Sequence, residues 1–181
     1  MKPRKSKAIV VDASIARSAG LTENPTSVAC RQILDTILQY CHRIAVSQAA
    51  RQEWSNHASG YSVRWYAAMT ARRKVLLVPG TVSQAELQAR LEASISQVSQ
   101  QEAVAKDFHL LIAALETDKI VLTRGERLRR ILHTAAQQVG ELRGLIFANP
   151  VASDEKVIAW LNRGAPAERH RCLGYKPRKP K

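Results

Sequence analysis

A short apolar stretch that ends in a carboxylate constrains the fold of this chain most. Lys7–Ser14 reads K-A-I-V-V-D-A-S, and its apolar part, 8–11, is rich in β-branched residues. An apolar run of this length, bounded by polar residues, is typical of a strand buried on both faces of a parallel sheet. The carboxyl ends of central strands form the ligand crevice of such a sheet, so Asp12 lies at the edge where binding and catalytic residues are usually found. An Asp also commonly caps the following turn, and this strand alone does not decide between the two roles.

Further apolar runs alternate with helical patterns along the rest of the chain. Asn24 followed by Pro25 is a helix start, and residues 13–23 before it are expected to be a loop. The predicted strands cover 8–11, 43–47, 74–79, 119–123 and 142–150. The predicted helices cover 25–42, 47–74 with a break near Gly60, 83–95, 107–115, 128–139 and 154–161. This alternation predicts an α/β fold: a three-layer α/β/α sandwich with a mainly parallel central sheet.

Length and charge limit the class of protein. A chain of 181 residues suits one domain, and we expect a basic N-terminal segment at 1–7, a domain at 8–164 and a basic C-terminal tail at 165–181. The formal net charge of +13 indicates a polyanionic partner, and nucleic acid is commoner than membrane for such a chain. No apolar run is long enough to span a bilayer and no signal peptide is recognisable, so a cytoplasmic location is expected. The three cysteines lack the spacing of a zinc site.

Four acidic residues fall where a doubly wound sheet gathers its functional groups. Asp12 and Glu126 follow the ends of predicted strands, Glu53 lies early in the helix after the second strand, and Asp107 begins the helix before the fourth. Like charges in close quarters resist ionisation, and a divalent cation would relieve that repulsion. Hard carboxylate oxygens suit Mg²⁺ or Mn²⁺. The structural alternatives are helix caps, above all for Asp107.

This order of elements and acids resembles the PIN domain, a family of metal-dependent ribonucleases. The resemblance covers roughly 8–161 and rests on V-V-D-A-S with Asp12, on Glu53, on D-F-H-L-L-I-A-A-L-E-T-D-K-I-V-L-T at 107–123, and on N-P-V-A-S-D-E-K-V-I-A-W-L-N-R-G at 149–164. It implies the strand order 3-2-1-4-5, with the Asp12 strand in the centre.

The resemblance also implies a function. The chain would be a divalent-metal-dependent endoribonuclease that hydrolyses phosphodiester bonds in single-stranded or structured RNA. Asp12, Glu53 and Asp107 would bind the metal, with Ser14 and Thr123 as polar neighbours. Small bacterial members are commonly toxins of toxin–antitoxin pairs, which makes an acidic antitoxin protein and a homodimer the expected protein partners.

The chain departs from the family pattern after its fourth strand. The family usually has T-x-D or S-x-D there, whereas T-R-G-E places Gly125 at the position of that Asp. Either Glu126, one residue further on, supplies the fourth acid, or that acid is missing and only one metal is held.

Basic and aromatic side chains near these acids have two interpretations each. Four arginines follow the fourth strand and are candidates for holding RNA phosphates, although a solvated helix face is an equal alternative: Arg124, Arg127, Arg129 and Arg130. The aromatic residues between Trp54 and Tyr66 are suited to stacking on RNA or to contacting a protein partner, but we favour a role in the core.

Two other classes of protein compete with a nuclease. Haloacid-dehalogenase-like phosphatases also begin with a strand that ends in Asp, but their D-x-D pattern is absent because residue 14 is Ser. A PIN-like module that binds RNA or protein with weak or no catalysis remains the alternative, and Gly125 together with the basic ends favours it.

Overall fold

A five-stranded parallel sheet forms the centre of the computed structural model, which describes residues 6–80 and 84–177. The strand order is β3-β2-β1-β4-β5, so the predicted order and the central position of the Asp12 strand are confirmed. The strands are β1 (Ala8–Val11), β2 (Arg43–Val46), β3 (Val75–Leu77), β4 (Ile120–Leu122) and β5 (Ile146–Ala148).

The register aligns the carboxyl ends of the central strands at one edge. Ile9 pairs with Ile44 of β2 on one side and with Ile120 of β4 on the other. At the end of β1, Val11 lies opposite Leu122. The residues that follow β1 and β4 therefore emerge side by side.

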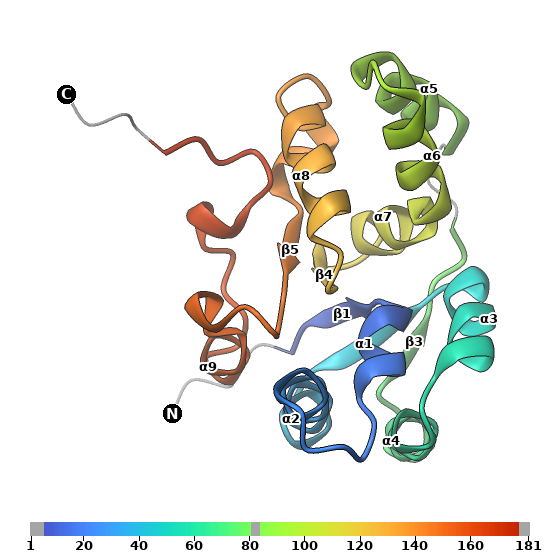
Figure 1. The fold of residues 1–181 in the computed structure, drawn as a ribbon, viewed down its shortest axis with the longest axis vertical. Helices are drawn as coiled ribbons and strands as arrows, with labels where there is room; N and C mark the ends of the chain where they lie inside the picture. Colours follow the sequence, from blue (N-terminus) through green and yellow to red (C-terminus); the bar gives the residue numbers. More distant parts are fainter. Residues whose placement is uncertain (1–5, 81–83, 178–181) are drawn as a thin grey trace.

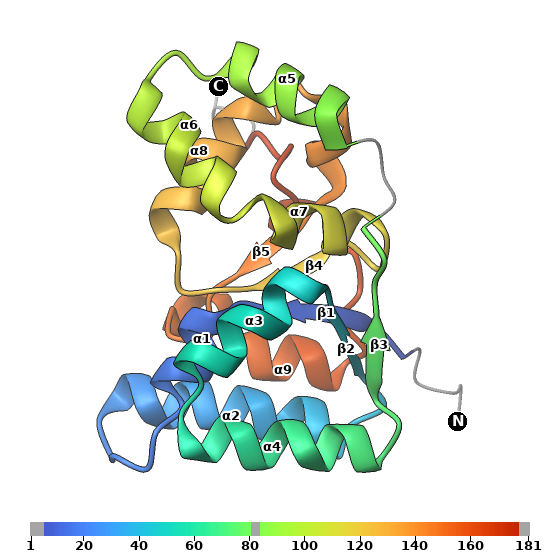
Figure 2. The same cartoon turned by 90° about the vertical axis from the view of Figure 1, so that its right-hand side faces the viewer.

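Helices cover both faces of the sheet, which confirms the three-layer sandwich (Figures 1 and 2). Helices α7 and α8 pack on one face with α5 and α6 beyond them, while α1, α2, α3, α4 and α9 lie toward the other. The side chains of β1 alternate between the two cores on either face of the sheet. Val10 packs in the core under α7 and α8, whereas Ile9 and Val11 pack in the core that includes α1 and α2. This alternation is the physical reason for the unbroken apolar run in β1.

The helices have the following bounds. They are α1 (Ala13–Ser18), α2 (Pro25–Gln39), α3 (Gln48–His57), α4 (Gly60–Ala71), α5 (Gln84–Ser94), α6 (Val98–Lys106), α7 (Phe108–Leu115), α8 (Glu126–Ala135) and α9 (Val157–Asn162). Short 3₁₀ turns lie at Gly140–Gly144, Ser153–Glu155 and Arg169–Arg171.

Side-chain caps explain where several helices begin. The Asn24 side chain accepts a hydrogen bond from the Ser27 amide (2.8 Å), with Pro25 at the first helical position, so the predicted start of α2 is confirmed. Ser47 caps α3 in the same way. Ser59 caps α4, which accounts for the expected break near Gly60.

The expectation of a loop over 13–23 was wrong for its first part. Helix α1 begins directly after Asp12, whose carboxylate accepts a hydrogen bond from the Ser14 amide (3.2 Å). Ile15 and Ala16 are fully buried in the core. Tertiary packing and a cap stabilise this short helix, although its sequence carries too few residues to show a helical period.

The chain after Gly164, expected to be a tail, packs against the domain in its described part. The Trp160 indole donates a hydrogen bond to the Pro166 carbonyl (2.9 Å), Cys172 forms an antiparallel bridge with Ile146, and Leu173 is buried. Residues 1–5 of the expected N-terminal segment and 178–181 of the tail lie outside the described residues. Within 6–80 and 84–177, no helix has the length and apolar character needed to cross a membrane.

Candidate active site

Asp12 lies at the carboxyl end of β1 and is held by two hydroxyl groups. Its Oδ2 accepts hydrogen bonds from the hydroxyls of Ser14 and Thr123, both at 2.6 Å. Thr123 follows β4 and is buried, so its bond fixes the Asp12 carboxylate across two neighbouring strands. Both predicted polar neighbours thus contact Asp12. Asp12 caps α1, and its carboxylate also lies at the carboxyl end of β1, so the capping role does not exclude the predicted functional one.

Glu53 is brought to the same edge by the residue after it. The Trp54 indole Nε1–H donates a hydrogen bond to the carbonyl oxygen of Val11 (3.0 Å), the last residue of β1. The Trp54 ring also stacks on Trp65, with ring centroids 5.8 Å apart. These two contacts fix α3 beside the end of β1, and Glu53 therefore lies near Asp12.

Asp107 stands between α6 and α7, and its side chain makes no capping hydrogen bond. Asp107 thus occupies the N-cap position that we considered for it, but its carboxylate does not cap α7. Burial raises the pKa of the Asp107 carboxyl, and the negative charges of Asp12 and Glu53 raise it further, against smaller opposing effects of His109 and Lys106. Three of the four predicted acids thus act on one another.

His109 is a member of this group that the sequence analysis did not identify. Its Nε2 lies 3.4 Å from Glu53 Oε2, and this nitrogen is buried without a hydrogen-bond partner among the described residues. The contact links α7 to α3 and so places Asp107 and Glu53 at the same edge. The sequence feature that could have indicated His109 is its position as a polar residue within the apolar stripe of 108–115.

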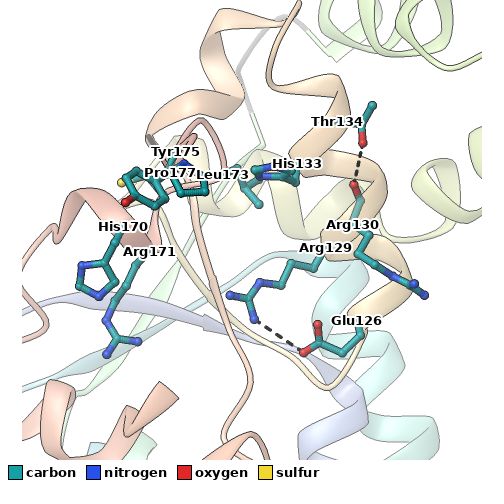
Figure 3. Close-up of a pocket in the computed structure, with 11 residues that line it drawn as sticks. Glu126, Arg129, Arg130, His133, Thr134, His170, Arg171, Leu173, Tyr175 and Pro177 are labelled. Carbon is teal, nitrogen blue, oxygen red and sulfur yellow. Dashed lines mark hydrogen bonds and ion pairs between the residues drawn. The ribbon is translucent and has the colours of Figure 1, made fainter. Parts of the chain in front are cut away.

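Glu126 is not part of this group. It begins α8, its side chain is half exposed, and its Oε1 accepts a hydrogen bond from the Asn149 side-chain amide (2.8 Å). Figure 3 shows Glu126 joined to Arg129, whose guanidinium lies 3.7 Å away. Asp12 and Glu53, but not Glu126, are the acids that raise the pKa of Asp107.

Gly125, which occupies the place of the family's usual Asp, lies close to the group. Its backbone amide donates to the Thr123 hydroxyl oxygen (2.9 Å), and that hydroxyl in turn donates to Asp12. A Cβ atom at this position would approach the Thr123 oxygen to 3.2 Å. Residue 125 is therefore near enough to contribute to the site, but glycine offers no side chain.

The four predicted RNA-binding arginines differ in how they are engaged. Arg129 pairs with Glu155 as well as with Glu126. Arg124 donates to the Ser18 hydroxyl, and Arg127 donates to the Ser99 carbonyl (3.3 Å). Arg130 is exposed, and no ion pair within the described ranges involves its guanidinium. Arg124, Arg127 and Arg130 thus keep their charge uncompensated by a paired carboxylate.

The aromatic residues between Trp54 and Tyr66 mostly belong to the core, as we favoured. Trp54 and Trp65 are buried, and the Trp65 indole donates a hydrogen bond to the Leu34 carbonyl (2.6 Å). Their rings are therefore not available to stack on RNA bases.

The chemistry of the three acids fits a divalent cation, but their present side-chain positions do not enclose one. Carboxylate oxygens are the ligands that Mg²⁺ and Mn²⁺ prefer, and a cation would relieve the repulsion that raises the pKa of Asp107. In the part of the chain that the structure describes, no group of three or more His, Cys, Asp or Glu side chains converges closely enough to hold an ion. Common ligation by Asp12, Glu53 and Asp107 would require their side chains to turn toward one point.

Two cavities flank this edge of the sheet. One, of about 890 Å³, lies between α3, the end of β3 and the α6–α7 junction. The other, of about 520 Å³, lies between α8 and the C-terminal segment (Figure 3), where His133 points from α8 toward Leu173. The first lies beside the acids, because its lining includes residues next to Glu53 and Asp107 in the chain.

Comparison of the chain with protein-family models, with curated proteins and with solved structures found no match. The resemblance to the PIN domain therefore rests on the sequence motifs, and of what it implied, the strand order is present in the structure.

Proposed function

We propose that this chain is a divalent-metal-dependent endoribonuclease that hydrolyses phosphodiester bonds in single-stranded or loop RNA. The observation that carries the proposal is the proximity of Asp12 and Glu53 to Asp107, whose pKa their charges raise, near the carboxyl edge of the central strands. Two contacts produce it: the hydrogen bond from Trp54 to the end of β1, and the approach of His109 to Glu53. In open parallel sheets this edge is where ligands bind.

Asp12, Glu53 and Asp107 would hold Mg²⁺ or Mn²⁺. When bound, such a cation supplies an activated water and neutralises charge that develops on a phosphoryl group. Ser14 and Thr123 orient the Asp12 carboxylate through their hydroxyls. Glu126 is engaged by Asn149 and Arg129, so the proposal rests on three acids and one cation.

RNA is the partner best suited to the charge of the chain. The formal net charge is +13, and Arg124, Arg127 and Arg130 form no ion pair with a carboxylate of residues 6–80 or 84–177. These cations follow β4 at the edge where the acids gather and would contact phosphates that flank the cleaved bond. An acidic antitoxin that covers this edge and a homodimer are further proposals, which rest on the resemblance to PIN-domain toxins.

Cleavage of a fluorescently labelled single-stranded RNA, with Mg²⁺ or Mn²⁺ and with excess chelator, tests the proposal. Asp12→Asn and Glu53→Gln should abolish cleavage while the far-ultraviolet circular dichroism stays native. Glu86→Gln is a matched control, because Glu86 is an exposed acid of α5. Cleavage that persists in chelator, or in the Asp12→Asn variant, contradicts a metal-dependent site at these residues.

A catalytically weak or inactive RNA-binding module is the second candidate. Gly125 supplies no fourth acid, and Glu126 is turned toward Arg129 (Figure 3). This candidate predicts that the unaltered chain binds the same RNA in chelator but does not cut it with either metal. The cleavage assay separates the two candidates without further variants.

A further inference from the structure

We infer that the cavity of about 890 Å³ between α3, the end of β3 and the α6–α7 junction is a nucleotide subsite that receives one residue of the RNA strand beside the cleaved bond. This inference rests on the proposed function and adds where the substrate lies. The lining residues Gln52 and Lys106 directly precede Glu53 and Asp107, so the cavity opens next to the acids.

The charge of the cavity favours an anionic ligand. Its lining residues include Arg51 and Lys106, and none of the lining residues is acidic. Both residues are exposed, and within residues 6–80 and 84–177 neither side chain forms an ion pair or a hydrogen bond, although the charge of Lys106 lowers the pKa of Asp107. These two cations, one from α3 and one from α6, suit phosphate groups of a strand that passes along the cavity.

The cavity between α8 and the C-terminal segment offers a weaker case. Its lining includes Glu126, and its Arg129 is already paired with Glu155. Arg171 of the same lining is paired with Glu168 (2.7 Å). Those guanidinium groups would have to leave a carboxylate to bind a phosphate.

The remaining walls suit a nucleobase. Amide side chains of Gln48, Gln52 and Gln84 line the cavity, and each amide carries both donors and an acceptor, as the edge of a base requires. Val78 and Ile112 provide apolar surface for the face of a base. The volume lies within the range of roughly 300–1,000 Å³ that is usual for small-ligand sites.

Hydrogen bonds hold Gly80 and Gln84, two of the residues that line the cavity. The Gly80 amide donates to the Glu116 carboxylate (3.0 Å), and the Gln84 side chain donates to the Gly80 carbonyl (2.8 Å). Gly80 has a φ of +70°, a conformation that glycine adopts without steric cost. Gly80 and the Gln84 side chain therefore already have partners before any ligand binds, which reduces the entropy lost when they order around it.

The test for the phosphate contacts is a comparison of two double variants by fluorescence anisotropy. Each loses two positive charges: Arg51→Gln/Lys106→Gln within the cavity, and Arg64→Gln/Arg72→Gln as a control among exposed residues of α4 and its end. A short labelled single-stranded RNA is titrated in chelator, so that binding is measured without cleavage, over a series of salt concentrations. The cavity variant should bind roughly tenfold more weakly, and the slope of log Kd against log salt should fall by about 1.4, because each phosphate contact to a single strand contributes about 0.7. The control should change the affinity less than about twofold.

A second comparison tests the base contacts without changing the charge. Gln48→Ala/Gln52→Ala should narrow the difference in affinity between oligo-A, oligo-C and oligo-U. The salt slope should stay unchanged, because the variant loses no positive charge. Gln32→Ala/Gln39→Ala, two exposed amides of α2, is the control.

The outcomes separate this inference from the proposed function. If the unaltered chain binds and cuts RNA but the two charge variants weaken binding equally, the cavity is not the subsite and the nuclease proposal stands. The subsite is likewise ruled out if the amide variant keeps the full base preference. If the unaltered chain neither binds nor cuts RNA, the proposed function fails, and the inference fails with it.

Discussion

Replacing Trp54 by Phe should damage the candidate site more than the fold. The substitution removes the indole N–H that bonds to the Val11 carbonyl (3.0 Å) and leaves a buried acceptor without that donor, which costs about 1–3 kcal/mol. The Trp54 side chain is only 8% exposed, so the smaller ring also leaves a cavity, which adds about 1 kcal/mol to the loss in the free energy of unfolding. We therefore expect the free energy of unfolding to fall by about 2–4 kcal/mol, which leaves a domain of ordinary stability folded.

Trp65 provides a matched control for this change. It is buried as well, with 3% exposed, it donates its indole N–H to the Leu34 carbonyl (2.6 Å), and its ring stacks on Trp54. Trp65→Phe should cost a similar free energy of unfolding, measured by urea denaturation. Only Trp54→Phe should also weaken Mg²⁺-dependent RNA cleavage and the stabilisation that Mg²⁺ gives, because Trp54, unlike Trp65, donates a hydrogen bond to the end of β1. Equal losses of cleavage in the two variants would refute the positioning role of Trp54, and a stability loss below about 0.5 kcal/mol would refute the hydrogen-bond argument.

Three further predictions follow from groups whose surroundings are known. Asp107→Asn should raise the free energy of unfolding of the metal-free protein at neutral pH, because the raised pKa of Asp107 means that its ionised form is disfavoured in the folded state; the variant should also lose its stabilisation by Mg²⁺. In acid, below the pH range in which carboxyl groups titrate, the urea midpoints of the variant and the unaltered chain should be the same. His42 is fully buried, accepts a hydrogen bond from the Lys7 amide (3.2 Å) and contacts the Leu161 carbonyl (2.9 Å). Because burial lowers the pKa of His42, the free energy of unfolding should fall as the pH drops below about 6.5, and an unchanged pH dependence in His42→Asn would contradict this. Leu173→Ala should lower the free energy of unfolding by about 2–5 kcal/mol, whereas a loss below about 0.5 kcal/mol would show that the segment after Gly164 is a free tail.

The sequence was sufficient for the fold because its signals are local and repeat along the chain. The run at 8–11 is apolar on both faces, and the structure divides those side chains between two cores. Caps such as Asn24 mark helix starts through a single side-chain bond, which a sequence displays directly. Helix α1 was missed because a cap and long-range packing of Ile15 stabilise it, and neither leaves a period in so short a segment.

The site was predictable in its acids but not in the contacts that assemble them. Asp12, Glu53 and Asp107 were identified from their places after strands and at helix starts. In the structure the charges of Asp12 and Glu53 act on Asp107, although in the part of the chain that is described the three side chains do not enclose an ion. The contacts responsible join residues far apart in the chain: Trp54 bonds to Val11, and His109 approaches Glu53. No local pattern specifies such pairs. Glu126 illustrates the opposite case, because its position after β4 is suitable but its partners, Asn149 and Arg129, hold it elsewhere.

The same difficulty affected the C-terminal segment. Its charge suggested a solvated tail, since cationic runs usually remain in water. One of the side chains that anchor it is Leu173, a buried apolar residue, and the backbone amide of Leu173 donates to the Leu145 carbonyl (2.8 Å). Contacts of this kind have no period in the sequence and are visible only in three dimensions.

The surroundings of Asp12, Glu53 and Asp107 are the strongest structural argument that these three acids bind a cation from outside the chain. Partly shielded acids elsewhere are neutralised by the protein itself: Glu155 pairs with Arg129, and Glu168 pairs with Arg171. At the carboxyl edge, by contrast, Asp12 accepts hydrogen bonds from two hydroxyls, and Glu53 lies near an imidazole. The chain carries 28 Lys and Arg residues, so cations are abundant, yet within residues 6–80 and 84–177 none of them forms an ion pair with these three carboxylates. Burying negative charge without such a partner costs free energy, and a bound divalent cation would recover it.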